Sequence, residues 1–467
     1  MPKSRIALVC MVLLCLAFAG CPATVTVPSV VGKTQAAATT DILAAKLVVG
    51  QITTQASETV AVGCVISQNP AAGASASSGA AVSLVISLGT VPEVAWHYQP
   101  AGAGVWGQGI AQAQDGGYVV SGGDTLYSMY ALKLNALGQK TWEYTYSNLA
   151  PNNAELWRHV SSDIQPTADG GFLMLGSGHS YNDGFPDRSY VFVKLTAAGL
   201  VSSSTVYAPL NPYSPGNFCS ETVPGALDMT SDGGYVAFGS SYCGGYDLAS
   251  IYKANSSGVM QFGKVINDNN RTYDQQILDG QQTSDGGYIL AGYSENGFPS
   301  GYGALLIKLN SSGNLVWHQA YQDVLGDHGA DAYCVTETSD GGYVIAGDRW
   351  NSLTKALNHG PFMAKYTSTG NPVWACTYSS ANTAADVHCL KETPDGELLA
   401  VGQMSGKLTL SKYNSNGGLL WNFKMENLTS CRGKDFVLTG DGGCVILGSS
   451  PAGGPTLIVK VNNVYTP

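Results

Sequence analysis

The chain has 467 residues, of which 12% are charged and 58 are glycine, and its formal net charge is −10. This length allows several domains, and the glycines, together with 25 tyrosines and 8 tryptophans, favour a turn-rich β protein over a helical one. The negative charge argues against nucleic acid as a partner, because proteins that bind a phosphate backbone need a positive surface.

The first 20 residues have the features of a secretion signal. Lys3 and Arg5 precede an apolar run over residues 6–19, which is too short for an ordinary membrane span. The run leads into the sequence LAFAGC at residues 16–21, which resembles the lipobox of bacterial lipoproteins. In that family the cysteine is acylated and becomes the mature N-terminus.

We therefore expect residues 1–20 to be a signal peptide, Cys21 to carry lipid, and residues 21–24 to form a lipidated tether. The other interpretation is a plain secretory signal whose cleavage site lies near a cysteine. Either interpretation places the remaining chain outside the cytoplasm of a bacterium. With lipid attached, the expected location is the cell envelope, anchored to the outer membrane or cell surface by lipid alone.

Residues 25–89 are predicted to form a small α+β domain. An extended segment, VPSVVG at residues 27–32, precedes an Ala-rich helical pattern over residues 34–46. Turn residues in QNPAAG (68–73) then separate alternating strands that end with residues 82–89. This order resembles the PASTA domain, a module of bacterial wall-synthesis enzymes and wall-sensing kinases. The resemblance implies either a peptidoglycan contact or a stalk.

Eight cysteines remain after Cys21 and the signal segment are set aside. Secretion would allow some of them to pair, although spacing does not reveal the connectivity. Cys219 and Cys243 are the candidate disulfide, because both fall in or beside loops of one repeat. The sequence has no C-x-x-C arrangement among these eight, so it predicts no zinc or redox site.

From residue 93 onward a hairpin motif recurs about every 54 residues. Asp-Gly between two apolar runs indicates a tight turn, because glycine adopts positive φ without strain. The motif begins at Asp115, Asp169, Asp232, Asp285, Asp340, Asp395 and Asp441. Seven repeats of this length indicate a ring of β-propeller blades.

A second motif follows the hairpin in every repeat, as in LIKLNSSGNLVW at residues 306–317. The seventh repeat contains only the first part of this motif. The complete motif predicts a strand, a short turn and an outer strand, which makes each repeat a four-stranded meander. We expect the recurrent lysine to be a solvated side chain and the recurrent tryptophan to fill the gap between neighbouring blades. The lysines are Lys133, Lys194, Lys253, Lys308, Lys365, Lys412 and Lys460.

The seventh repeat ends without its outer strand, and a matching strand stands before the first repeat, at residues 93–98. We expect this N-terminal strand to complete the last blade and close the ring, which removes an exposed sheet edge. The predicted fold is therefore mainly β: a seven-bladed propeller of four-stranded blades over residues 93–467, preceded by the PASTA domain.

The two repeated turns share one face of the propeller, and the variable connections share the other. The motif aspartate and lysine are separated by 17 to 25 residues, so the loops between them differ in length. Variable loops on a rigid scaffold are where binding usually occurs. The candidate ligand-binding residues in or beside these loops are Trp157, Arg158, His159, Tyr181, Asp183, Arg188, Tyr246, Asp247, Arg271, Tyr273, Asp327, His328, Arg349, Trp350 and His359. Such aromatic and charged side chains suit a glycan or a protein surface.

Catalytic motifs are lacking in the sequence, which has no G-x-S-x-G and no H-E-x-x-H. Asp163, Asp279 and Asp435 each precede a motif aspartate by six residues and are expected to line the central channel. They allow a cation site or acid–base chemistry, and the alternative is a hydrated polar channel. We expect no catalytic residues, no metal and no cofactor.

The D-G-G-Y hairpins with L-x-K-L-N-x-x-G-x-x-x-W resemble bacterial propellers common among secreted and surface proteins. The G-x-x-x-W half is similar to the tryptophan-docking repeat of quinoprotein dehydrogenases and of the outer-membrane assembly lipoprotein. The predicted function is a monomeric, non-enzymatic binding or scaffold lipoprotein that recognises peptidoglycan, another glycan or an envelope protein. The alternatives are an envelope-protein assembly scaffold and a quinoprotein-like or polysaccharide-active enzyme.

Overall fold

The computed structural model of the chain forms two compact units, residues Met1–Val91 and Pro92–Pro467. It describes residues 24–55, 57, 59–87, 89, 92–101, 104–126, 128–147, 149, 156–180, 189–207, 219, 221–266, 274–295, 303–321, 328–351, 360–378, 385–428, 431–449 and 456–465. The expected signal peptide and Cys21 lie outside these residues. No helix within the described ranges is long and apolar enough to cross a membrane.

The first unit is a small α+β fold. Its elements are β1 (Thr24–Thr26), α1 (Gln35–Ala44), β2 (Val48–Gln55), β3 (Val65–Asn69), β4 (Ser75–Ser77) and β5 (Ala81–Ser87). Strands β2, β5 and β3 form one sheet in that order, and β1 pairs with β4. The helix begins where the Thr34 hydroxyl accepts a hydrogen bond from the Ala37 N–H. Its residues Ala38 and Ile42 pack into an apolar core with strand residues such as Leu84.

Gln68 holds the turn of this unit in place. Its side-chain oxygen accepts a hydrogen bond from the Val30 N–H at 2.9 Å. Its amide group donates to the carbonyl oxygens of Pro28 and Pro70 at 2.9 and 3.2 Å. One side chain therefore joins the N-terminal extended segment to the turn after β3.

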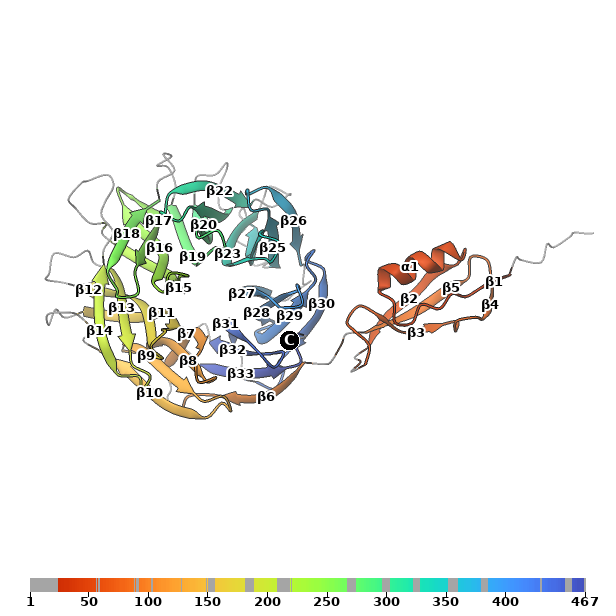
Figure 1. Cartoon of the computed structure of the whole chain (residues 1–467), viewed down its shortest axis with the longest axis horizontal. Coiled ribbons are helices and arrows are strands. Elements are labelled where there is room, and N and C mark those ends of the chain that lie inside the picture. Colours follow the sequence, from red (N-terminus) through yellow and green to blue (C-terminus); the bar gives the residue numbers. More distant parts are fainter. Residues whose placement is uncertain are drawn as a thin grey trace, which may run out of the picture. The chain divides into compact units, whose positions relative to one another are not determined.

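The second unit is a ring of four-stranded antiparallel sheets (Figure 1). The described residues form seven such sheets, which we number as blades 1 to 7. Blade 1 comprises β7 (Val105–Gln112), β8 (Tyr118–Asp124), β9 (Met129–Leu134) and β10 (Lys140–Tyr146). Blade 2 comprises β11 (Leu156–Pro166), β12 (Phe172–Ser180), β13 (Ser189–Leu195) and β14 (Val201–Tyr207). Blade 3 comprises β15 (Glu221–Met229), β16 (Tyr235–Cys243), β17 (Tyr246–Ala254) and β18 (Met260–Val265).

Blades 4 to 6 continue the same order. Blade 4 comprises β19 (Asp274–Gln282), β20 (Tyr288–Glu295), β21 (Gly303–Leu309) and β22 (Leu315–Tyr321). Blade 5 comprises β23 (His328–Glu337), β24 (Tyr343–Asn351), β25 (Gly360–Tyr366) and β26 (Pro372–Thr377). Blade 6 comprises β27 (Ala385–Glu392), β28 (Leu398–Met404), β29 (Lys407–Tyr413) and β30 (Leu419–Lys424). The first strand of each blade is innermost in the ring and the last strand is outermost (Figure 1).

Blade 7 takes its strands from both ends of the propeller. It contains β31 (Arg432–Thr439), β32 (Gly443–Ser449), β33 (Leu457–Asn462) and the N-terminal β6 (Glu93–Tyr98). Strand β6 pairs antiparallel with β33, with Tyr98 opposite Ile458. The prediction that the N-terminal strand completes the last blade is confirmed.

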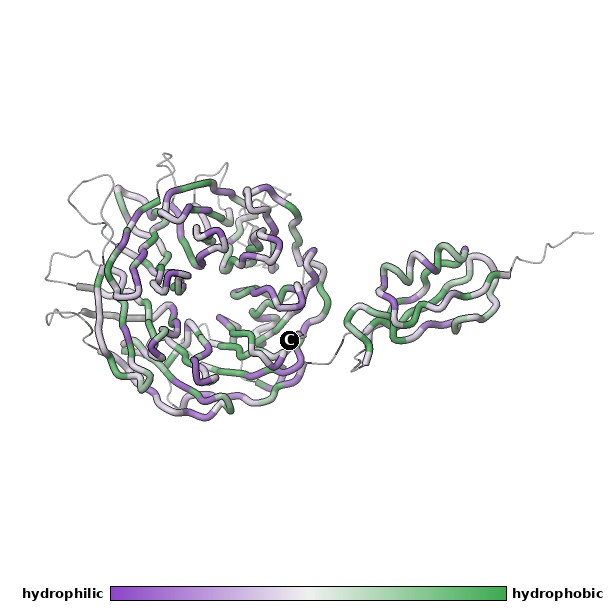
Figure 2. The backbone as a smooth tube through the Cα atoms, in the orientation of Figure 1, coloured by the Kyte–Doolittle hydropathy of each residue, from purple (hydrophilic) through white to green (hydrophobic). Residues whose placement is uncertain are grey.

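The hydrophobic core of the propeller lies between neighbouring blades. Hydrophobic segments recur along the strands around the ring (Figure 2). One buried cluster joins Val119 and Ala131 of blade 1 to Phe172 and Val191 of blade 2. Clusters of the same kind span blades 4 and 5 and blades 6 and 7. Each blade is therefore stabilised by its neighbours, as apolar area is removed from water on both of its faces.

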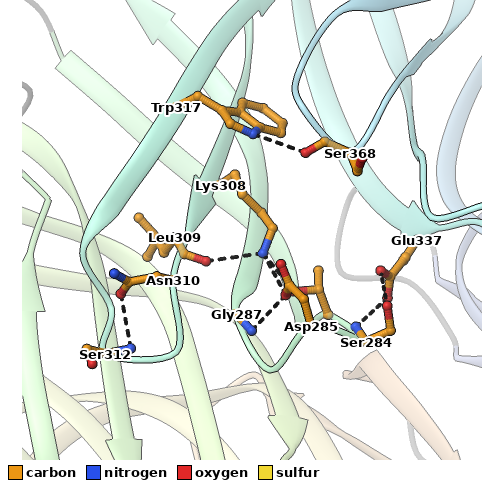
Figure 3. A network of polar contacts seen from close by, with 11 residues as sticks. Ser284, Asp285, Gly287, Lys308, Leu309, Asn310, Ser312, Trp317, Glu337 and Ser368 are labelled. Atoms are coloured by element: carbon orange, nitrogen blue, oxygen red, sulfur yellow. Dashed lines mark hydrogen bonds and ion pairs between the residues drawn. The ribbon is translucent and has the colours of Figure 1, made fainter.

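The recurrent lysine is buried in most blades, so the prediction of a solvated side chain was wrong. In blade 4, Lys308 is 3% exposed and contacts the Asp285 carboxylate at 2.9 Å (Figure 3). Its ammonium also donates to the Thr283 hydroxyl and the Leu309 carbonyl oxygen. All seven blades have the same lysine–aspartate pair, at 2.6 to 3.0 Å. The pair joins the third strand to the Asp-Gly turn, and only in blade 2 is the lysine side chain substantially exposed.

Acid should weaken this set of contacts. The Lys pairing and hydrogen bonds from neighbouring threonines lower the pKa values of Asp232, Asp285 and Asp340 to about 2. A carboxyl group whose pKa is lowered by folding stabilises the fold above its unfolded pKa of about 3.9. That stability is lost as pH falls through the folded value. We expect the melting temperature to drop steeply between pH 4 and pH 2, and a flat profile there would contradict this role.

The outer-strand tryptophan packs against the next blade, as predicted. The Trp317 indole N–H donates to the Ser368 carbonyl oxygen at 3.2 Å, and Trp142 and Trp374 make equivalent bonds (Figure 3). The ring covers the turn glycine of that next blade, where a Cβ atom on Gly370 would lie 2.9 Å from Trp317 Cδ2. The turn glycine is therefore needed both for its positive φ and for the space beneath the indole.

Blade 3 contains a disulfide between Cys219 and Cys243. Both residues are buried, and they join the segment before β15 to the end of β16. Among the described cysteines, Cys64, Cys334, Cys376, Cys389, Cys431 and Cys444 are free thiols.

Candidate ligand site in the propeller channel

The inner strands surround a cavity of about 590 Å³ that is lined by residues of all seven blades. Each first strand carries a β-bulge in this region, where one residue has no partner on the second strand. A bulge of this kind redirects a side chain without breaking the sheet. The seven bulge residues are Gln108, Ser162, Gly225, Leu278, Tyr333, His388 and Lys434, and all of them line the cavity.

The bulge residues divide the channel into two unlike halves. Blades 5, 6, 7 and 1 contribute the large polar side chains of Tyr333, His388, Lys434 and Gln108. Blades 2, 3 and 4 contribute a serine, a glycine and a leucine at the same position. The polar half can form hydrogen bonds, and the other half leaves room for a bound group.

The three channel aspartates named from the sequence join neighbouring blades. Asp163 accepts hydrogen bonds from the N–H groups of Ile164 in its own blade and Leu227 in the next, at 2.7 and 3.0 Å. Asp279 makes the same contacts with Gly280 and Val335. These carboxylates satisfy backbone groups that the bulges leave unpaired.

Asp435 makes the third contact of this kind, between blade 7 and blade 1. It accepts hydrogen bonds from the N–H groups of Phe436 and Ile110, at 2.7 and 3.0 Å. The Lys391 ammonium lies 3.7 Å from its Oδ1. Asp435 therefore ties the last blade to the first and so helps to close the ring.

Electrostatic coupling in the channel changes which of these groups are charged. Burial, and then repulsion by Asp435, raise the pKa of Asp163 to about 8. Burial raises the pKa of Asp279 to about 6. The pKa of Lys391 is raised, because attraction by the channel carboxylates, above all Asp435, outweighs the loss of hydration that opposes it. At neutral pH the middle of the channel thus contains a protonated Asp163 and a Lys391–Asp435 ion pair.

The channel end beside the Asp-Gly turns is occupied by contacts between blades. The Glu337 carboxylate accepts hydrogen bonds from the Ser284 N–H and hydroxyl, both at 2.7 Å (Figure 3). Glu392 contacts Ser339 of the preceding blade in the same way. These carboxylates are therefore part of the framework.

The opposite end of the channel holds a cluster of charged and aromatic side chains on blades 5 to 7. His388 stacks on Tyr333 with ring centroids 4.5 Å apart and an interplanar angle of 13°. Asp386 is buried and accepts from Gln403 and from Arg432, whose Nη2 lies 3.0 Å from Asp386 Oδ2. Asp386 and His388 on β27, Arg432 on β31 and Gln403 on β28 lie in the halves of their strands that are farther from the Asp-Gly turns, and Tyr333 lies near the middle of β23.

Some polar atoms of this cluster have no protein partner. Asp331 Oδ1, His388 Nε2 and Arg432 Nε are buried and make no hydrogen bond with the part of the chain that the structure describes. The distance from His388 Nε2 to Asp386 Oδ2 is 3.7 Å, which is too long for a hydrogen bond. Burial, with repulsion by Asp348 and Glu295, raises the pKa of Asp331 to about 7. Buried polar atoms without partners are costly in a folded protein, which makes them candidates for ligand contact.

The candidate residues named from the sequence are only partly described. Tyr246 and Asp247 begin β17, where the Asp247 N–H donates to Asp274 Oδ1 and its carboxylate accepts from Gln276. Burial, and then the Asp274 charge, raise the pKa of Asp247. Arg349 lies on β24 opposite Ala330.

The other candidates are described by backbone alone or fall outside the description. Trp157, Arg158 and His159 lie on β11, His328 on β23 and Trp350 on β24, without a description of their side chains. Seven candidates lie outside the described residues: Tyr181, Asp183, Arg188, Arg271, Tyr273, Asp327 and His359.

The polar bulge residues are the part of the site that sequence reasoning missed. These residues, Tyr333, His388 and Lys434, each stand seven residues before a motif aspartate. The channel aspartates stand six residues before theirs, at the next position of the repeat. This constant spacing was the available signal. It was missed because the three residues differ in type, so that no repeated letter marks the position.

Comparison with known proteins supports both halves of this architecture. Residues 25–88 match the PASTA domain family. The chain matches none of the curated proteins by sequence. By structure it is similar to a PL25 ulvan lyase bound to a GlcA–Rha3S saccharide, at 10% identity and a TM-score of 0.52, covering 78% of this chain and 96% of that one.

Two further solved structures are similar at the same level. Polysaccharide lyase Uly1 shares 10% identity at a TM-score of 0.51, covering 79% of this chain and all of that chain (100%). The BP39L lectin from Burkholderia pseudomallei shares 9% identity at 0.49, covering 78% of this chain and 97% of that one. At these identities the likeness shows the fold alone. The protein is thus a β-propeller preceded by a PASTA domain, a module that suggests an extracytoplasmic location.

Proposed function

We propose that this protein is a lipid-anchored, non-enzymatic binding protein of the bacterial envelope. Its propeller presents the channel end away from the Asp-Gly turns to a glycan or protein ligand. Its PASTA domain serves as a cell-wall contact or as a stalk. PASTA domains generally bind peptidoglycan or other glycans, which supports the wall assignment.

The observation that carries this proposal is the contrast between the two ends of the channel. At the Asp-Gly end, Glu337 and Glu392 are used in contacts between blades. At the other end, Asp331, His388 and Arg432 retain buried atoms without a partner among the described residues. Buried polar atoms without hydrogen bonds destabilise a framework, whereas a bound ligand can supply the missing hydrogen bonds.

Co-sedimentation with purified peptidoglycan sacculi tests the proposal, using residues 25–467 and residues 93–467. We expect the longer chain to pellet with the sacculi, because it contains the PASTA domain. Pelleting of the shorter chain as well would assign wall binding to the propeller. If neither pellets, the wall contact is wrong, and crosslinking to envelope proteins then tests the protein-ligand version.

The alternatives from the sequence keep their own tests. An envelope-assembly scaffold should yield a specific partner protein on crosslinking in intact cells. A quinoprotein should reduce dyes in a quinone-dependent reaction, and a polysaccharide-active enzyme should release shorter oligosaccharides. A positive result in either activity assay would replace the non-enzymatic proposal.

A further inference from the structure

We propose that Lys434 and His388 form a subsite in the channel that binds a carboxylate group of the ligand. This inference deepens the proposed function, on which it rests, by naming the chemistry of the ligand. The carboxylate belongs either to an acidic sugar or to an acidic amino acid of a peptide, because both present the same group.

Lys434 is a channel cation without an ion-pair partner in the described part of the chain. It is the bulge residue of β31 and lines the cavity. Lys434 makes no ion pair with any residue in the described part of the chain. The nearby carboxylates are occupied, since Asp386 pairs with Arg432 and Asp435 accepts two backbone hydrogen bonds.

The environment of Lys434 favours an added anion. Burial, and then repulsion by Arg432, lower its pKa, although attraction by Asp386 opposes them in part, and a carboxylate within ion-pair distance would raise it further. A part-buried cation beside a second cation is destabilising until an anion reaches it. A bound carboxylate would supply this missing partner.

His388 provides a hydrogen-bond partner on the neighbouring blade. It is the bulge residue of β27, its side chain is 10% exposed, and its buried Nε2 has no partner among the residues described. Stacking on Tyr333 holds the ring in one orientation. Burial lowers the pKa of His388, so its ring is neutral at pH 7 and can donate one hydrogen bond.

The channel also has room for the group that carries the carboxylate. Across from the polar half, the bulge positions are occupied by Ser162, Gly225 and Leu278. The cavity of about 590 Å³ lies within the usual range for small-molecule sites. A sugar ring or an amino-acid side chain is therefore of suitable size.

The cavity also contains carboxyl groups, and some of their negative charge is removed by protonation or pairing. The pKa of Asp163 is raised to about 8, so its carboxyl is mostly protonated at neutral pH. Asp435 lies 3.7 Å from Lys391 and is neutralised in part by it. Asp279, with a pKa raised to about 6, also lines the cavity, as do Asp228 and the two framework carboxylates Glu337 and Glu392. Lys434, which has no ion-pair partner among the described residues, supplies a positive charge at its own side of the channel.

Titration calorimetry of the full chain with small probes tests this subsite. The probes are galacturonate and N-acetylglutamate, with galactose as the neutral match for the sugar. We expect at least one carboxylate probe to bind tenfold or more tightly than galactose, and the tighter of the two identifies the source. Lys434→Met should weaken that binding about tenfold or more, because it removes a charged hydrogen-bond donor to the carboxylate.

Three variants make the result specific. Lys434→Arg keeps the cation and should retain more affinity than Lys434→Met. Lys424→Met is the matched control, because Lys424 lies on the outer strand β30 and pairs with Glu426. His388→Leu should weaken binding on its own, which provides a second test should Lys434→Met not fold.

Two results would overturn the inference: carboxylate probes that bind no better than galactose, or equal losses in Lys434→Met and Lys424→Met. Failure of the proposed function would give a different result from failure of the subsite. If the propeller pellets with sacculi while the probes do not bind, envelope binding stands and the subsite is wrong. If the probes bind and neither chain pellets, the subsite stands and the wall contact is wrong.

Discussion

Asp285→Ala should lower the free energy of unfolding by about 2 kcal/mol, because it removes the charged acceptor of the buried Lys308 ammonium. Lys308 is 3% exposed and contacts Asp285 at 2.9 Å. The same carboxylate accepts from the Gly287 N–H and the Thr283 hydroxyl, so those two groups lose a partner as well. Urea denaturation followed by tryptophan fluorescence measures the effect.

Blade 6 contains the matched control for this substitution. Its motif reads Asp-Gly-Glu, and Lys412 contacts both Asp395 at 2.9 Å and Glu397 at 2.6 Å. Asp395→Ala leaves Glu397 in place, so we expect a loss of about 1 kcal/mol. Equal losses for the two substitutions would show that the contact between Lys308 and Asp285 is not the source of the stability.

Gly370→Ala should lower the free energy of unfolding by about 3 kcal/mol. The turn requires φ of +83° at Gly370, a region that costs an L-residue roughly 1–2 kcal/mol. The added Cβ would also lie 2.9 Å from the indole of Trp317, and overpacking of this kind costs about 1–3 kcal/mol. The sum of the two terms gives the expected loss, measured by the same denaturation experiment.

Gly258→Ala separates the two terms. Gly258 has φ of +80° in the equivalent turn of blade 3, but blade 2 has Ser203 where other blades have a tryptophan or phenylalanine. Its added Cβ would meet only the Tyr235 hydroxyl, at 3.5 Å, so we expect a loss of about 1 kcal/mol. In a Trp317→Ala background, the cost of Gly370→Ala should fall to this value. If it does not, the indole contact is not the reason for the glycine.

The framework contacts and the candidate site use the same residue types in different ways. Asp285, Asp163 and Glu337 all satisfy a cation or backbone N–H groups, and each contact joins a turn, a bulge or a neighbouring blade. Lys434 and His388 lie at one bulge position in adjacent blades and satisfy no such framework group. Position in the repeat, together with the absence of a partner among the described residues, distinguishes a binding residue from a structural one.

The sequence by itself determined the elements and their order. Asp-Gly turns form locally, because glycine accepts positive φ and the aspartate bonds to the N–H two residues later, as Asp285 does with Gly287. The missing outer strand of the last repeat also identified β6 as its replacement, since an unpaired sheet edge is unfavourable. The same local reasoning found the PASTA domain, whose helix, turns and strands follow one another within about 65 residues.

Only the tertiary structure decided which side chains meet. Asp285 and Lys308 are 23 residues apart, and whether the lysine was solvated or buried depended on how the blades pack. The polar bulge residues Tyr333, His388 and Lys434 are of different types and lie about 50 residues apart in the sequence. They come together only because the ring brings every first strand to one axis. Contacts within a turn are set by neighbouring residues, whereas the channel site exists only after all the blades have closed around it.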